Sequence, residues 1–161
     1  MPKTIKVGIA DLKVTQEPNV LTTLGLGSCV GICLWDRVSR IAGLAHIMLP
    51  SMSDISKRDT NPMKYADSAI DVILKEMIDL GAKKTRIIAK IAGGAHMFSN
   101  VEGNAVKIGD LNVAAVKDKL QEANIKLVAE DTGEDYGRTV ELHSTNGKLL
   151  VKTAMKGIKE L

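Results

Sequence analysis

LTTLGLGSCVGICLWDRVSRIAGLAHIMLP, residues 21–50, is the stretch of sequence that decides the fold. Two apolar runs within it, residues 30–35 and 41–49, contain several of the β-branched residues that favour strands. A glycine-rich turn precedes the first run, the polar connector DRVSR joins the two runs, and Pro50 follows the second. The pattern predicts a β-hairpin that begins directly after a glycine-rich turn.

Strands are expected on both sides of this hairpin. They occupy residues 4–10, 20–24, 86–91, 125–129, 139–143 and 148–153, with the turn signal Asn146-Gly147 between the last two. Strands thus cluster near both ends of the chain, and helical patterns lie in its middle. This order predicts the α+β class, with mixed, largely antiparallel β-sheets flanked by two long helices.

Apolar residues at helical spacing predict the two helices. The first is expected to have Asn61 as its N-cap and Pro62 at its first position, and to stop at Gly81. The second is expected to begin near Asp110, which would be its N-cap. The apolar face of the first helix comprises Ala66, Ala69, Ile70, Ile73, Met77 and Leu80, and that of the second Val113, Val116, Leu120 and Ala123.

The composition indicates one globular domain, residues 1–161, and argues against several classes of protein. The chain has 45% hydrophobic and 25% charged residues and a net charge of +3. No apolar run approaches the ~20 residues of a membrane span, and the N-terminus lacks a signal-peptide core, so we expect a cytoplasmic protein without membrane insertion. Basic and acidic residues are mixed and only 2% are aromatic, which argues against nucleic-acid binding.

The cysteines and histidines do not form a recognisable metal or disulfide motif. Cys29 and Cys33 would lie roughly 13 Å apart in an extended strand, whereas a disulfide needs about 4.4–6.8 Å between its Cα atoms. We therefore expect free thiols, a reducing compartment and no metal site. The other two histidines, His96 and His143, have no evident acidic or thiol partner in the sequence and are interpreted as structural.

A candidate catalytic pair lies within the predicted hairpin. Glycines before Cys29 allow close approach of a substrate, and the amides around Gly27 and Ser28 would suit an oxyanion hole. If the turn is centred between residues 37 and 38, Cys29 and His46 face each other with Cβ atoms about 4.5–5.5 Å apart. That distance suits a Cys–His ion pair. A longer loop or a bulge would change the register.

Plainer interpretations of these residues stay open on spacing alone. A cysteine among apolar residues is more often a packing residue than a nucleophile, and Cys33 fits that description well. A single histidine such as His46 is more often a half-buried structural residue. The glycine-rich turn lacks the downstream helix that a dinucleotide site requires.

Several blocks of sequence together resemble the CheD family, the chemoreceptor glutamine deamidases of bacterial and archaeal chemotaxis. The blocks occur in order over most of the chain, which makes them more specific than any single motif. They are TLGLGSCVG (23–31), AHIMLP (45–50), KYAD (64–67), AKIAGGAHMF (89–98), IGDLN (108–112), AEDTG (129–133) and the closing TNGKLLVK (145–152). One departure is Glu134, which stands where family members often have a second glycine.

The resemblance implies a reaction and roles for three side chains. Cys29 matches the family's catalytic cysteine, His46 its histidine and Thr23 its threonine. The implied reaction is hydrolysis of receptor glutamine to glutamate with release of ammonia, without a metal or organic cofactor. The implied fold is similar to that of toxin deamidases with a Cys–His pair.

The resemblance also implies partners. These are the cytoplasmic helices of chemoreceptors as substrate and the phosphatase CheC. Separately from the resemblance, we expect a monomer or a hetero-complex. The polar segment 50–61 is a surface loop expected to contribute to recognition. Two alternatives remain: an adaptor of receptor and CheC without important catalysis, and a redox-sensing thiol protein.

Overall fold

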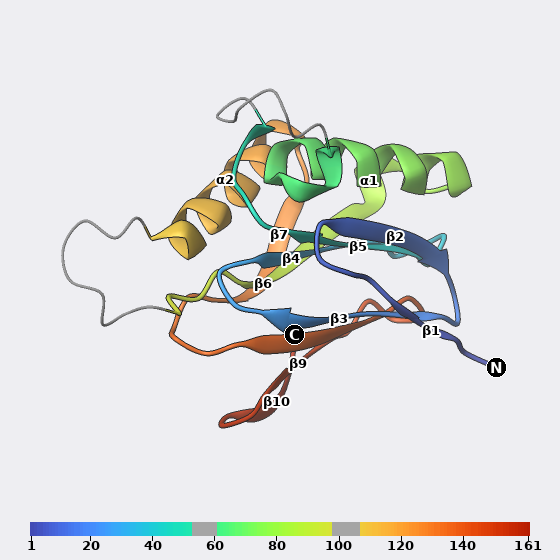
Figure 1. The fold of residues 1–161 in the computed structure, drawn as a ribbon. Coiled ribbons are helices and arrows are strands. Elements are labelled where there is room, and N and C mark those ends of the chain that lie inside the picture. The colour runs from blue at the N-terminus through green and yellow to red at the C-terminus, as the bar shows by residue number, and fades with distance from the viewer. Residues whose placement is uncertain (53–60, 98–106) are drawn as a thin grey trace.

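The computed structural model describes residues 1–52, 61–97 and 107–161, and within these ranges ten strands form two sheets. Two long helices and the short 3₁₀ turns η2 (Pro62–Lys64) and η3 (Lys84–Arg86) complete the fold (Figure 1). The first sheet has the order β1 (Thr4–Lys6), β3 (Val20–Leu26), β8 (Arg138–His143), β9 (Leu149–Thr153) and β10 (Gly157–Glu160). The second has the order β2 (Asp11–Gln16), β5 (Ile41–Ile47), β4 (Val30–Asp36), β6 (Ile87–Gly93) and β7 (Lys126–Thr132).

The molecule has three layers, with the second sheet in the middle (Figure 1). Helices α1 (Ala66–Leu80) and α2 (Ile108–Glu122) cover one face of that sheet, and the first sheet covers the other. Most strand pairs are antiparallel, whereas β1 pairs with β3 and β6 with β7 in parallel. The predicted α+β class with mixed, largely antiparallel sheets and two long helices is therefore confirmed.

Burial on both faces explains why the β4–β5 hairpin reads as two continuous apolar runs. Ile32 and Leu34 of β4 pack in the cluster beneath the helices, whereas Cys33 packs in the cluster between the sheets. In β5, Ala45 points to the helices and Leu44 to the other sheet. Successive residues thus enter opposite hydrophobic clusters, and neither face of the hairpin needs polar side chains.

The predicted register of this hairpin is wrong by two residues. His46 lies opposite Gly31, not opposite Cys29, because a four-residue loop, residues 37–40, joins the strands. The carboxylate of Asp36 fixes that loop by accepting hydrogen bonds from the amides of Val38 at 2.9 Å and Ser39 at 3.2 Å. A shift of two residues preserves the face on which each side chain lies.

The first helix begins later than predicted. Asn61 accepts a hydrogen bond from the amide of Met63, but it caps η2 rather than α1. Tyr65 is extended and forms a parallel bridge with Leu49, which ends η2 and delays α1 until Ala66. Gly81 ends α1 in the left-handed conformation, as predicted, with φ of 119°.

The remaining differences concern edges and helix ends. Leu80 was expected on the apolar face but is 46% exposed, and Leu74 is buried there instead. The second helix starts two residues before Asp110, so this carboxylate lies in the first turn and is not the N-cap. The apolar pattern predicts neither β2 nor β10, because β2 is an edge strand with charged residues and all of β10 is exposed.

Candidate active site

The candidate site lies where the chain crosses from one sheet to the other. Thr23 belongs to β3 of the first sheet, and His46 belongs to β5 of the second. Cys29 lies between them in the segment 27–29, which links β3 to β4 and is called the crossover below. The pairing of β3 with β8 is interrupted between Thr23 and Leu26, where Gly25 has a φ of 69°. This irregularity bends the end of β3 before the crossover.

Hydrogen bonds fix the tautomer of His46. The hydroxyl of Thr23 lies 2.7 Å from Nδ1 of His46 and 2.7 Å from the carbonyl oxygen of Val7. A carbonyl oxygen only accepts, so the single hydroxyl proton of Thr23 is donated to Val7. Oγ1 of Thr23 must then accept a hydrogen bond from Nδ1–H of His46. The imidazole therefore carries its proton on Nδ1 and presents an unprotonated Nε2.

The Nε2 atom of His46 is free to act as a base. The side chain is fully buried, and Nε2 has no hydrogen-bond partner among the residues that the structure describes. Burial lowers the pKa of His46 to about 4 from its ordinary 6.5, because the charged imidazolium is poorly solvated there. At neutral pH the ring is thus uncharged, with a buried, unpartnered lone pair on Nε2.

The two thiols differ in environment. Cys29 is partly exposed, and burial raises the pKa of its thiol while its own backbone amide opposes that rise. Burial raises the pKa of the Cys33 thiol to about 12, although the nearby charge of Lys90 acts in the opposite direction. The environment thus favours a neutral thiol and a neutral imidazole in the resting site, rather than the ion pair considered from the sequence.

Hydrogen bonds to its carbonyl oxygens hold the crossover in place. The carbonyl oxygens of residues 27, 28 and 29 accept hydrogen bonds from the amide of Ala95 at 2.9 Å, Nδ2 of Asn112 at 2.9 Å and the amide of Gly94 at 2.8 Å. Gly93 is required here, because a Cβ on it would lie 2.3 Å from the carbonyl oxygen of Cys29. Within the described ranges, the amides of Gly27 and Ser28 donate no hydrogen bond, whereas the amide of Cys29 bonds its own thiol.

Sequence reasoning missed two contributors to this arrangement. The carbonyl oxygen of Val7 is a main-chain group, and no residue pattern could indicate it. Asn112 had a signal: it lies four residues before Val116 on the apolar face of α2 and is fully buried. A polar residue at such a position implies specific partners.

The other two histidines have acidic neighbours that were not evident in the sequence, and their interpretation as structural residues is not contradicted. His96 Nε2 lies 2.7 Å from Oδ1 of Asp110, and His143 Nε2 lies 3.9 Å from a carboxylate oxygen of Glu141. The first pair forms because α2 places its first turn beside the segment after β6. Neither contact involves Cys29 or His46.

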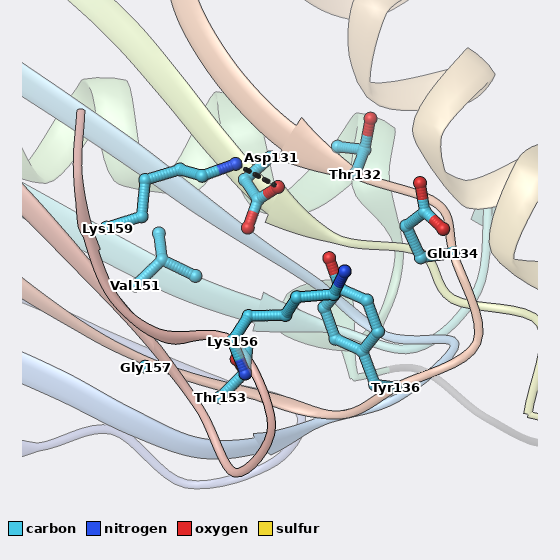
Figure 2. A pocket seen from close by; sticks show the side chains of 9 residues that line it. All are labelled: Asp131, Thr132, Glu134, Tyr136, Val151, Thr153, Lys156, Gly157 and Lys159. Carbon is cyan, nitrogen blue, oxygen red and sulfur yellow. Dashed lines mark hydrogen bonds and ion pairs between the residues drawn. The ribbon is translucent and has the colours of Figure 1, made fainter.

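A separate polar cavity of about 370 Å³ lies among β7, the segment that follows it, β9 and β10 (Figure 2). Its lining includes Asp131, Tyr136 and Lys159 but none of the predicted site residues. The carboxylate of Asp131 is already bound by Lys159 at 3.3 Å and by Arg138 at 3.2 Å. The Asp131 carboxylate is therefore neutralised by its two basic neighbours, and the crossover remains the candidate site.

Fold and geometry together describe an α+β protein with a free thiol at a sheet crossover and a neutral imidazole held by a threonine. Residues 48–153 match the model of the family CheD, described as chemotactic sensory transduction. The chain belongs to the CheD family. The family match begins after Thr23, Cys29 and His46, which only the full-length relatives cover.

Two relatives illustrate that coverage. The probable chemoreceptor glutamine deamidase CheD of Caldanaerobacter subterraneus is 50% identical over 98% of this chain and 97% of its own length. The chemoreceptor glutamine deamidase CheD of Halalkalibacterium halodurans is 46% identical over the whole of both chains. Among solved structures, Neisseria meningitidis protein NMB0706 of family DUF152 has a TM-score of 0.52 at 10% identity, over 81% of this chain and 64% of that one. That last similarity concerns the fold alone.

Proposed function

We propose that this protein hydrolyses the side-chain amide of glutamines in chemotaxis receptors, forming glutamate and ammonia, with Cys29 as the nucleophile. The observation that carries the proposal is the neutral His46, whose Nε2 is unpartnered within the described residues while Thr23 and Val7 fix its Nδ1 proton. Relatives named chemoreceptor glutamine deamidase, 46–50% identical over nearly the full length, supply the substrate class.

The first half of the reaction forms a thioester. His46 Nε2 takes the thiol proton as Sγ of Cys29 attacks the amide carbon, because neither group is charged beforehand. The oxyanion that develops would be stabilised by the amides of the crossover, Gly27 and Ser28 included. The carbon–nitrogen bond then breaks, the proton on Nε2 passes to the leaving nitrogen, and ammonia departs.

The second half regenerates the enzyme. Water attacks the thioester as His46 Nε2 accepts one of its protons, and the carbon–sulfur bond breaks. That proton returns to the sulfur of Cys29, so one water is consumed for each glutamate and ammonia formed. During both halves the bond from Nδ1–H to Thr23 keeps the ring oriented and stabilises the transient imidazolium.

The raised pKa of the partly exposed Cys29 thiol argues against the redox-sensing alternative. Redox-sensor cysteines are accessible and have a lowered pKa, whereas burial raises the pKa of this thiol. The adaptor alternative predicts that the protein binds receptors without changing them. Binding of CheC, a monomeric state, a cytoplasmic location and a single domain of residues 1–161 stay predictions. The proposed recognition loop, residues 50–61, lies mostly outside the described residues.

The test is peptide mass mapping of a chemoreceptor cytoplasmic fragment after incubation with the protein. Conversion of glutamine to glutamate at defined sites, lost in Cys29→Ala and in His46→Ala but retained in Cys33→Ala, is the expected result. Cys33 is the matched control because it is the second thiol of the same hairpin and is buried between the sheets. A folded, reduced protein that converts no glutamine would contradict the proposal and favour the adaptor.

A further inference from the structure

A buried side-chain amide joins the two chain segments that carry the candidate pair. Asn112 is fully buried, and its Nδ2 donates to the carbonyl oxygens of Ser28 and Met48, both at 2.9 Å. Ser28 directly precedes Cys29, and Met48 follows His46 by two residues. One side chain thus contacts both segments beside the candidate nucleophile and base.

This contact begins where the β-ladder stops. The last residue pair between β4 and β5 at this end is Val30 with Ile47. Beyond it, the carbonyl oxygen of Cys29 accepts from the amide of Gly94, which continues the pairing of β4 with β6 and makes no connection to β5. The two hydrogens on Nδ2 of Asn112 therefore connect segments that the sheet itself leaves unconnected.

Helix α2 is docked so that Asn112 reaches this position. Gly109 lies one turn earlier on the helix, and a Cβ there would lie 2.4 Å from the carbonyl oxygen of Gly94 and 2.6 Å from that of Ala95. The amides of Gly94 and Ala95 are the groups that hold the crossover. The block IGDLN thus combines a glycine for close approach with an asparagine for the connection.

The side-chain oxygen of Asn112 indicates that a contribution to stability alone does not explain why an asparagine stands at this position. Oδ1 of Asn112 is buried and accepts no hydrogen bond from any described residue. A buried acceptor without a donor costs stability. An apolar side chain on the helix would avoid that cost but would leave Ser28 and Met48 unconnected.

We propose that Asn112 is a positioning residue, which sets the separation of the Cys29 thiol from the His46 imidazole by joining their two segments. The inference deepens the proposed function and rests on it only for the deamidation readout. Thiol reactivity tests it without any receptor, because alkylation of Cys29 depends on the same proton acceptor. A misplacement of about 1 Å can reduce a rate by about 100-fold, so the effect is measurable.

The experiment measures the rate of Cys29 alkylation by iodoacetamide against pH, with peptide mapping to separate Cys29 from Cys33. We expect Asn112→Ala to lower the rate at neutral pH at least tenfold and to change its pH profile to that of His46→Ala. Asn112→Ala combined with His46→Ala should react no more slowly than His46→Ala alone, because Asn112 acts through the pair. In the receptor assay kcat should fall while KM stays unchanged.

Two further variants separate positioning from stability. Val116→Ala, one turn further along the buried face of α2, should lower the melting temperature without changing the alkylation profile. Asn112→Ser keeps one hydrogen-bond donor and replaces Asn112→Ala in the experiment if that variant does not fold. Its rate of Cys29 alkylation should lie between those of the wild type and His46→Ala. If the Asn112 variants match Val116→Ala in alkylation, the inference is overturned. If they lose reactivity but the wild type leaves receptors unmodified, the inference survives and only the proposed function fails.

Discussion

The hydrogen-bond chain from Val7 through Thr23 to His46 makes a sharp prediction for Thr23→Val, which keeps the shape of the side chain and removes its hydroxyl. Two buried groups then lose the hydroxyl that each of them contacts: the carbonyl oxygen of Val7 and Nδ1–H of His46. The variant should therefore be less stable, and its imidazole should lose the preference for the Nδ1–H tautomer.

The magnitude follows from the two lost hydrogen bonds. Leaving a buried polar group unsatisfied costs about 1–3 kcal/mol, so the free energy of unfolding should fall by roughly 2–6 kcal/mol. The about 1–3 kcal/mol lost by Nδ1–H of His46 corresponds to a change of roughly 5- to 150-fold in the ratio of the Nδ1–H to the Nε2–H tautomer. The Nε2–H tautomer cannot accept a proton from Cys29 on that atom, so the deamidation rate should decrease by up to the same factor.

Urea denaturation measures the stability, and nitrogen NMR of the imidazole distinguishes the protonated from the unprotonated ring nitrogen. Thr23→Ser is the control, because it keeps the hydroxyl and should keep both the tautomer and most of the activity. A Thr23→Val protein with wild-type stability, an Nδ1–H imidazole and unchanged activity would refute the reasoning.

Three further predictions concern pH, one strained residue and the hairpin loop. The pKa of His46 is lowered to about 4 from 6.5, so between these pH values the unfolded state takes up a proton and the folded state does not, and stability should fall as the pH drops through that window. Unfolding measured against pH should show a steeper fall for the wild type than for His46→Gln, and identical slopes would contradict the prediction. Glu134 has a φ of 62°, in the left-handed region that glycine favours, so Glu134→Gly should stabilise the fold by about 0.5–1 kcal/mol in thermal unfolding. Gly133→Ala, at a φ of 81°, should destabilise it, and a Glu134→Gly protein without any gain would show that the backbone of Glu134 is not strained. Asp36→Ala removes a fully buried carboxylate from Arg86 at 2.9 Å and should cost about 3–5 kcal/mol in urea denaturation, and a loss below about 1 kcal/mol would mean that this pair does not fix the loop.

Local sequence pattern predicts the parts of this fold that depend on local chemistry. The continuous apolar runs of β4 and β5 mark strands buried on both faces, and Gly81 marks a helix end. The departure noted at Glu134 also has a structural counterpart, since this residue adopts the left-handed backbone that glycine favours.

Local sequence pattern does not predict features that depend on contacts between residues far apart in the chain. The hairpin register is set by Asp36, whose second partner, Arg86, lies fifty residues further along the chain. Asp110 reads as an N-cap in sequence but binds His96 across the fold. The role of Thr23 came from family resemblance, because its neighbour His46 lies on another sheet.

That last arrangement has a consequence for how the protein becomes active. Thr23 and His46 lie on different sheets, so the bond between them forms only after the two layers have packed together. A newly made chain that has formed only the β4–β5 hairpin already contains both Cys29 and His46. It still lacks the contact between the Thr23 hydroxyl and His46 that fixes the proton on Nδ1. The proposed nucleophile would therefore be activated only at the end of folding, and a partly folded chain would carry the thiol without an oriented base.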